Sequence, residues 1–353
     1  MIALLRPVPP FIEFCKAENN SLSIGKTVPD REKLSKIIDS DAEIESIGYL
    51  LSHGGEVFTD TINIVGKDTL DTIEECIEFS PEYNELTFKA AKLFFETFPE
   101  VPHVLFCDTA YFSHLPDEAS AYAVPYHLRE QGIRRYGAFG LIHEWVWGKV
   151  KDISDTSVHK LISIHLGDSP NIAAIKDGNP IETTVGFTSS EGLPSSHGCG
   201  DLDPTVVFQL YAKGMPFKGI YNLLSNESGF TGLAGKECSY LDVIGDKADP
   251  DVSGVKQILL YSIIRYIGAF VSLLGGVDAL VFVANDLEQS RKFIGEICDS
   301  FGFLGISRES IVEMEEPAQE IGARNLKTKV LCMEQDQLNI MVYDLKKTVN
   351  REI

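Results

Sequence analysis

The chain has 353 residues, of which 44% are apolar and 24% are charged, and its formal net charge is −21. This length allows two domains with a large core, and the composition is that of an ordinary globular protein. The strong negative charge argues against nucleic acid and against an anionic membrane as partners. Any anionic substrate would therefore have to meet locally placed positive side chains.

The spacing of the cysteines and the length of the apolar runs further limit the class of protein to which the chain can belong. The seven cysteines are far apart and form no Cys-x-x-Cys pair: Cys15, Cys76, Cys107, Cys199, Cys238, Cys298 and Cys332. We expect reduced, mostly buried thiols in a cytoplasmic protein, because this spacing suits neither a zinc site nor a disulfide framework. The run Met1–Leu5 is too short for a signal peptide. The stretch Ile258–Leu274 contains Arg265 and falls short of a membrane span, so we interpret it as a core helix.

The first part of the chain alternates strands and helices. We interpret residues 6–10, Arg-Pro-Val-Pro-Pro, as a rigid connector because proline donates no ladder hydrogen bond. The buried strand 104–107 delivers Asp108 at its carboxyl end, where open α/β sheets hold ligand groups. The other expected elements are a hairpin at 11–28, a helix at 30–39, a strand within 44–51 and helices on either side of Pro81.

The remaining sequence continues this alternation. Its expected elements are a helix at 115–131, a loop at 134–140, a helix at 142–150, strands with a hairpin at 161–184, a helix at 255–274, a strand at 279–284, a helix at 293–301, a strand at 329–332 and a helix at 338–348. Gly275 and Gly276 end the long helix. We therefore predict two α/β domains of similar plan, joined near residues 110–150.

The stretch Leu161–Pro204 is typical of a phosphate-binding scaffold. It runs from a β-branched strand to a tight turn at Gly167, then through a second strand and a hairpin into a glycine-rich loop. Glycine lets backbone N–H groups approach an anion closely, and several kinases hold nucleotide phosphates in this way. Ordinary hairpin turns are the alternative interpretation of the same glycines.

Seven motifs follow one another in order along nearly the whole chain. They are Ser-His-Gly-Gly-Glu (52–56), Asp-Thr-Ala-Tyr (108–111), Gly-Ile-Arg-Arg-Tyr-Gly (132–137), His-Leu-Gly (165–167), Gly-Phe-Thr with Glu-Gly-Leu (186–193), Gly-Asp-Leu-Asp-Pro (200–204) and Tyr-Ile-Gly-Ala with Leu-Gly-Gly-Val-Asp-Ala (266–279). Together they resemble the acetate kinase family. The resemblance implies an α/β protein made of two actin-like/sugar-kinase-type domains with a cleft between them.

The resemblance also implies a domain division, a reaction and an assembly. The N-terminal actin-like domain would comprise residues 1–111 and be closed by the C-terminal helix 337–353. The second actin-like domain, 112–336, would carry a two-fold dimer surface. The family phosphorylates a short-chain carboxylate to an acyl phosphate, so ATP and Mg²⁺ are the cofactors expected if that activity is retained.

The catalytic positions implied by the resemblance are mostly changed. Asp108 is retained, whereas the two family arginines align with Leu50 and Gly198 and the family histidine aligns with Phe139. Phosphoryl transfer depends on cations and hydrogen-bond donors around the transferring group. At roughly 3 kcal/mol for each lost group, the three changes would cost about six orders of magnitude in rate.

The binding positions differ as well. The second phosphate loop aligns with His165, Leu166, Gly167 and Asp168, the adenosine loop with Asn285, Asp286 and Glu288, and the apolar carboxylate pocket with Ser52, Glu82, Ala138 and Ser189. The first phosphate loop is replaced by residues 6–10, and the metal-associated glutamate by Asp336 or Gln337. We predict no resident metal site, since His165, His197 and Cys199 lack ligand spacing.

These features lead to two functional hypotheses. The favoured one is an acetate-kinase-like protein that is catalytically impaired or non-catalytic and serves for binding or subunit pairing. The alternative is an active carboxylate kinase with an altered substrate and a rearranged site. Asp108 is then either a metal-linked carboxylate or a cap of the next turn. Arg134 and Arg135 either bind an anion or, as we favour, form structural salt bridges. We expect a homodimer, with a different protein as a further candidate partner.

Overall fold

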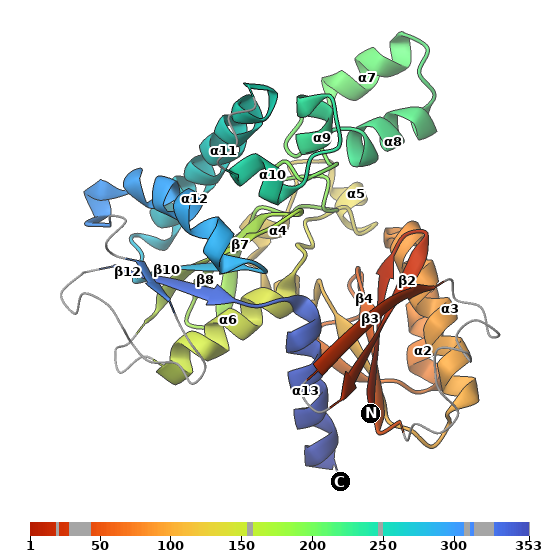
Figure 1. Ribbon diagram of the computed structural model, residues 1–353. Coiled ribbons are helices and arrows are strands. Elements are labelled where there is room, and N and C mark those ends of the chain that lie inside the picture. Colours follow the sequence, from red (N-terminus) through yellow and green to blue (C-terminus); the bar gives the residue numbers. More distant parts are fainter. Residues whose placement is uncertain are drawn as a thin grey trace. The chain divides into compact units, whose positions relative to one another are not determined.

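The computed structural model describes residues 1–18, 21–27, 44–153, 158–245, 250–306, 311–313 and 328–352. It divides into two units (Figure 1). Unit 1 contains Met1–His114, Ala138–Ile142 and Asp336–Ile353, and unit 2 contains Leu115–Gly137 and His143–Gln335. The helix expected at 30–39 lies outside the described residues.

Unit 1 is built on a mixed sheet of six described strands in the order β3-β2-β1-β4-β6-β5. β1, β4 and β6 are parallel, whereas β2, β3 and β5 pair antiparallel with their neighbours. The strands are β1 (Ile2–Val8), β2 (Phe11–Glu18), β3 (Ser21–Thr27), β4 (Ser46–Leu51), β5 (Ile62–Ile64) and β6 (His103–Cys107). The hairpin, the strand within 44–51 and the buried strand before Asp108 are thus confirmed.

Both faces of this sheet are covered by helices. The helices are α2 (Lys67–Glu75) and α3 (Pro81–Thr97), which belong to one core cluster, and α13 (Gln337–Glu352), which belongs to another. Side chains alternate between these clusters along β1, where Ala3 and Leu5 join the α2–α3 side while Ile2 and Leu4 join the α13 side. The helices on either side of Pro81 and the closing helix are confirmed.

The connector expected at residues 6–10 is wrong in its first three positions. Arg6, Pro7 and Val8 continue β1 and pair with β2, with Arg6 opposite Glu13. Proline is tolerated there because the pairing of β1 with β4 ends at Leu5, so the Pro7 nitrogen lies beyond the two-sided part of the strand. Only Pro9 and Pro10 remain as the turn.

Unit 2 is built on a second mixed sheet of six described strands in the order β11-β12-β10-β7-β8-β9. The strands are β7 (Lys160–Leu166), β8 (Asn171–Lys176), β9 (Asn179–Thr183), β10 (Ala279–Ala284), β11 (Ile311–Glu313) and β12 (Lys329–Glu334). β7 and β12 lie on either side of β10 and run parallel to it, and β7, β8 and β9 form an antiparallel meander. The strands and hairpin expected at 161–184 are confirmed.

The helices of unit 2 include several that sequence patterns did not predict. They are α4 (Asp117–Ser120), α5 (Tyr126–Arg129), α6 (Gly140–Ile153, whose first residues belong to unit 1), α7 (Thr205–Ala212), α8 (Phe217–Asn226), α9 (Gly229–Ala234), α10 (Tyr240–Ile244), α11 (Pro250–Leu274) and α12 (Leu287–Asp299). The single helix expected at 115–131 is wrong. The residue that follows α4, Ala121, is extended, and Pro125 then starts α5, because proline in a helix interior removes a backbone hydrogen bond.

The long helix α11 is a core helix with one exposed side. Leu259, Ile263 and Ile267 are fully buried in the core of unit 2, whereas Tyr261 and Leu273 are exposed. By length and composition alone its segment 252–274 is long and apolar enough for a membrane span, which corrects the expectation that it is too short. A core helix of a globular protein passes the same test.

All seven cysteines lie within the described residues and are free thiols. Six of them are buried, and Cys199 is half-buried. The expectation of mostly buried thiols is therefore confirmed.

Candidate functional site

Asp108 is the centre of a hydrogen-bonded corner in unit 1. Its carboxylate accepts from the Phe139 backbone N–H at 3.0 Å through Oδ2 and from Gln337 Nε2 at 2.7 Å through Oδ1. Its own N–H donates to the Leu51 carbonyl at 2.9 Å, and its carbonyl accepts from the Gly140 N–H at 2.8 Å. The residue thereby ties together β4, the start of α6 and the start of α13.

Burial changes the acidity of this carboxyl. Asp108 is only 7% exposed, and desolvation raises its pKa from 3.8 to about 7. The N–H groups of Phe139 and Leu141, the Gln337 amide and the charge of Arg6 act in the opposite direction. A carboxyl of this kind exchanges its proton near neutral pH, which is a property of general acids and bases and of some structural carboxyls.

Phe139 has an unusual backbone conformation beside Asp108. Its φ angle is +60°, in the left-handed region, which costs a residue other than glycine on the order of 1 kcal/mol or more. This conformation accompanies the N–H contact with the Asp108 carboxylate. At the position that the resemblance assigns to a catalytic histidine, the chain therefore contributes a backbone donor and a half-buried aromatic ring.

Leu50 belongs to the core of unit 1. It is 4% exposed and lies in the apolar cluster that contains Phe106, Met341 and Leu345. The position that the resemblance assigns to an arginine thus supports α13. Of the four positions assigned to the carboxylate pocket, Ser52 and Ala138 are half-buried in unit 1, Glu82 is exposed on α3, and Ser189 is exposed in unit 2.

The loop that follows β4 is fixed by two side chains that sequence patterns did not single out as site residues. Asn84, fully buried on α3, accepts from the His53 N–H at 3.3 Å and donates to the His53 carbonyl at 2.7 Å. Thr109 Oγ1 accepts from the Gly54 N–H at 2.9 Å. Gly54 itself admits no side chain, since a Cβ there would lie 2.3 Å from Cys107 Sγ.

In unit 2 the candidate nucleotide positions gather at one sheet edge. β7 and β10 are parallel neighbours with Leu166 opposite Ala284, so the segments that follow them begin side by side. Those segments contain Gly167 and Asp168 on one strand, and Asn285, Asp286 and Glu288 on the other. His165 is buried at this edge, and desolvation lowers the pKa of its imidazole to about 4.

Asp168 closes the loop after β7. Its Oδ1 accepts from Ser196 Oγ at 2.6 Å and from the Tyr240 N–H at 2.8 Å, and its carbonyl accepts from the Ser196 N–H at 2.8 Å. The carboxylate that replaces the family asparagine therefore joins this loop to residue 196 and to the start of α10. It has a structural role that its sequence position did not reveal.

Gly198 lies in a tight loop. Its N–H donates to Ser195 Oγ at 2.7 Å, and its carbonyl accepts from the Ser195 N–H at 3.1 Å. A Cβ at this position would lie 2.8 Å from Ser195 Oγ, so an arginine here would require Ser195 to move. The glycine fits the local turn.

The adenosine-loop positions serve as a helix start. Asp286 is the N-cap of α12, and its Oδ1 accepts from the Gln289 N–H at 2.9 Å. Glu288 follows in the first turn, where the helix dipole favours an acid. Arg135 pairs with Glu182 at 2.8 Å and donates to the Thr183 carbonyl at 2.6 Å, which confirms a structural salt bridge for this arginine.

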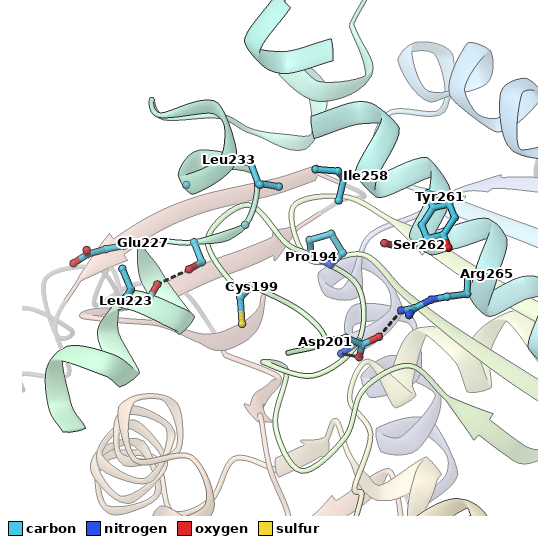
Figure 2. Close-up of a pocket in the computed structure, with 14 residues that line it drawn as sticks. Pro194, Cys199, Asp201, Leu223, Glu227, Leu233, Ile258, Tyr261, Ser262 and Arg265 are labelled. Carbon is cyan, nitrogen blue, oxygen red and sulfur yellow. Dashed lines mark hydrogen bonds and ion pairs between the residues drawn. The ribbon is translucent and has the colours of Figure 1, made fainter. Parts of the chain in front are cut away.

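Unit 2 also contains a surface hollow away from these positions. Its volume is about 570 Å³, and it lies between the 192–201 loop, the ends of α8 and α9, and α11 (Figure 2). Asp201 accepts there from Arg265 Nη2 at 2.5 Å and from the Tyr266 hydroxyl at 2.8 Å. None of the residues from His165 to Asp168 or from Asn285 to Glu288 lines it.

This chain has only some of the residues that the resemblance would require for binding ATP and Mg²⁺. Each Asp108 oxygen accepts one hydrogen bond from an N–H donor, so part of the acceptor capacity of this carboxylate is used within unit 1. Among the described residues, no group of three or more His, Cys, Asp or Glu side chains is placed to hold a metal ion. The turn at Gly167 is compatible with a phosphate, because a Cβ there would approach only the His165 ring, at 4.0 Å.

Comparisons with known proteins agree with this architecture. Residues 17–343 match the model of the acetokinase family. The chain is 33% identical to an acetate kinase of Thermosipho melanesiensis over 344 residues, covering 94% of this chain and 84% of that protein. It is 34% identical to an acetate kinase of Thermosipho africanus over 333 residues, covering 91% and 81%.

Solved structures show the same fold. A Porphyromonas gingivalis acetate kinase superimposes with a TM-score of 0.83 at 24% identity, covering 98% of both chains. A Francisella tularensis propionate kinase gives a TM-score of 0.82 at 22% identity, covering 98% and 99%. The two-domain actin-like α/β fold is thereby shown, and the chain belongs to the acetokinase family.

Proposed function

We propose that this chain is a carboxylate-kinase-like protein in which phosphoryl transfer from ATP to a short-chain carboxylate is impaired, and that it serves for binding or subunit pairing. The observation that carries the proposal is the state of Asp108. Both carboxylate oxygens of this retained group accept hydrogen bonds from within unit 1, from Phe139 and Gln337. It acts there as a structural tie between segments.

Electrostatics supports the same conclusion. Phosphoryl transfer requires cations that neutralise charge on the equatorial oxygens. The positions of the family's two arginines and its histidine are occupied by Leu50, Gly198 and Phe139. The combined loss corresponds to about six orders of magnitude in rate, although such contributions are not strictly additive.

A paired assay tests this proposal. The purified chain is incubated with ATP, Mg²⁺ and hydroxylamine together with acetate, propionate or butyrate, and acyl hydroxamate is measured. A thermal-shift series with ATP and Mg²⁺ runs in parallel. We expect product at the background level. Acyl phosphate formation at even modest turnover would refute impairment, whereas a thermal shift without product would support a nucleotide-binding protein.

An active carboxylate kinase with a rearranged site is the second candidate, and one observation favours it. Arg6 lies close enough to Asp108 to lower the pKa of its carboxyl, so a cation is present near the retained acid. Under this alternative, Arg6→Gln would abolish turnover with the preferred carboxylate. Lys26→Gln is the matched control, because Lys26 also pairs with Glu13 but is more than half exposed.

For assembly we propose a homodimer formed through unit 2. Large apolar side chains are exposed on neighbouring helices there: Phe208 and Tyr211 on α7, Phe217 and Tyr221 on α8, and Ile258 and Tyr261 on α11. The rings of Tyr211 and Phe217 stack at 4.5 Å and join two of these helices into one surface. Exposed apolar surface of this extent is typical of an interface. The free thiols accord with a cytoplasmic location, which we also propose.

Sedimentation at micromolar concentration tests the dimer. The unchanged chain should sediment with twice the mass of one chain, and Phe208→Glu combined with Tyr261→Glu should reduce this to one. Phe303→Glu is the control, since Phe303 is 75% exposed on a different segment. A monomeric unchanged chain would contradict the homodimer and favour a different protein as the partner.

A further inference from the structure

The helices α7 and α8 form an arm, residues 205–226, that projects from unit 2 beside α9 (Figure 1). None of the eight residues of α7, all of which the structure describes, is buried. Phe208 is 66% exposed, and the half-exposed ring of Tyr211 stacks on Phe217 of α8. An apolar helix that buries no residue in its own chain is typical of an interaction surface, because exposed apolar area is unfavourable in water.

The hollow of about 570 Å³ lies next to this arm (Figure 2). Its apolar wall includes Leu223 at the end of α8, Leu233 on α9 and Ile258 on α11. Because Leu223 belongs to the arm, the hollow begins where the arm ends. Leu233 and Ile258 are exposed large apolar side chains. A protrusion and a depression of apolar surface are therefore neighbours on unit 2.

Charge indicates which partner suits the arm. Residues 205–226 contain no acid, and their two basic side chains, Lys213 and Lys218, are exposed, although the net charge of the chain is −21. The charged residues that line the hollow are Asp201, Glu227 and Arg265, and Arg265 already pairs with Asp201. The basic arm of one chain is thus complementary to the acidic side of the hollow in a second copy.

In a two-fold dimer the same patch of each chain faces its counterpart, so a protrusion beside a depression can meet the depression of the other chain twice. We propose that the arm of each chain inserts α7 into the hollow of a second copy, with Phe208 against the apolar wall and the two lysines near Glu227. This proposal rests on the homodimer of the proposed function and specifies its contact as arm to hollow, in place of arm to arm. Reciprocal insertion removes the apolar surface of both segments from water.

Cross-linking between two differently marked chains tests the contact directly. One chain carries Gln209→Cys on α7, and the other carries Ser262→Cys in the α11 wall of the hollow. Both also carry Cys199→Ser, and the other six cysteines are buried. The two chains are co-expressed and treated with a short bismaleimide, and the linked peptides are identified by mass spectrometry. We expect linkage between positions 209 and 262 as the main product.

The linked peptides also distinguish the two possible contacts. Linkage of Gln209→Cys chains to one another as the main product would show an arm-to-arm contact and overturn the proposal. Phe303→Cys in place of Gln209→Cys is the control, since Phe303 is 75% exposed on a different segment and should give no linked dimer.

Sedimentation of the same chains separates this proposal from the homodimer itself. A dimer that shows no linkage between positions 209 and 262 would overturn the arm-to-hollow contact and leave the homodimer in place. A monomer would overturn both.

Charge reversal tests the complementarity independently. Lys213→Glu with Lys218→Glu should raise the Kd of the dimer about tenfold. Adding Glu227→Lys to that chain should restore most of the affinity, because each arm then meets the opposite charge in the hollow again. Lys89→Glu with Lys92→Glu, exposed on α3, changes the net charge equally and should leave the Kd nearly unchanged. A Kd that Glu227→Lys does not restore would overturn the proposal.

Discussion

The Asp108 corner of unit 1 and the His165 corner of unit 2 use buried polar groups in different ways. At Asp108 the side chain is the acceptor of two protein donors, so its hydrogen-bonding capacity is directed into the fold. At His165 the ring nitrogen Nδ1 is connected through the Asn171 side chain to the buried ring of His143. The direction of a residue's hydrogen bonds is therefore more informative about its function than the fact that its residue type is retained.

The largest change in stability is expected for Leu50→Arg in unit 1. An unpaired charge would be placed in the apolar cluster beneath α13, and we expect a loss of roughly 3–5 kcal/mol of stability in urea unfolding. Glu82→Arg, on the exposed side of α3, is the control and should stay within about 0.5 kcal/mol. A Leu50→Arg chain of unchanged stability would show that this position is open to a ligand after all.

Asp108→Asn should lower the free energy of unfolding by about 1–3 kcal/mol at low pH. The side-chain amide of asparagine has one NH₂ group, which would face one of the two N–H donors that now bind Asp108 and could not accept its hydrogen bond. The variant also tests the pKa of Asp108, which is about 7 in the folded chain against 3.8 for an unperturbed carboxyl. The native state then binds the proton more tightly, so this carboxyl lowers stability as pH rises from 3.8 towards 7.

The measurement is the stability difference between the two chains from pH 4 to pH 7. The penalty of Asp108→Asn should shrink as pH rises, because only the unchanged chain carries this titration. A penalty that grows with pH would mean that the ionised carboxylate is the favoured form and that the pKa is not raised.

The His143 network should show the opposite pH dependence. The folded pKa of His143 is about 3 against 6.5 for an unperturbed imidazole, so the unfolded state binds the proton more readily and stability falls as pH drops below 6.5. His143→Gln should remove this contribution and flatten the curve between pH 4 and 6.5. Equal slopes for the two chains in that window would contradict a neutral buried His143.

Asp286→Ala should give the smallest effect. Loss of the N-cap of α12 is expected to cost about 1 kcal/mol in thermal or urea unfolding. Glu288→Ala, two residues further on and exposed, should change stability by less than about 0.5 kcal/mol. If ATP raises the stability of the unchanged chain but not of Asp286→Ala, the residue contacts the nucleotide in addition to capping the helix.

Local patterns predicted much of the scaffold. The alternation of buried strands and amphipathic helices located Asp108 at the end of β6 and the turn after β7, because those signals lie within a few residues of each other. Where the prediction failed, tertiary context decided the outcome. Pro7 stays in β1 because the pairing of β1 with β4 has already ended at Leu5, and Pro125 divides a helix that apolar spacing alone made continuous.

The partners of the site residues were beyond the reach of local patterns. Gln337 is 229 residues from Asp108, and Asn171 is 28 residues from His143, so neither contact leaves a periodic signal. The left-handed backbone at Phe139 is also set by its surroundings, since phenylalanine has no preference for it. Sequence located the positions, and only the folded chain shows what each one binds.

Transfer of the radiolabelled γ-phosphate of ATP to acetate, propionate or butyrate is the most direct test of impaired catalysis, since it detects turnover far below the hydroxamate assay. The Thermosipho africanus acetate kinase, assayed side by side, provides the reference rate. We predict a rate lower than the reference by about six orders of magnitude. A rate within about a hundredfold of the reference would show that the Asp108 corner still performs phosphoryl transfer.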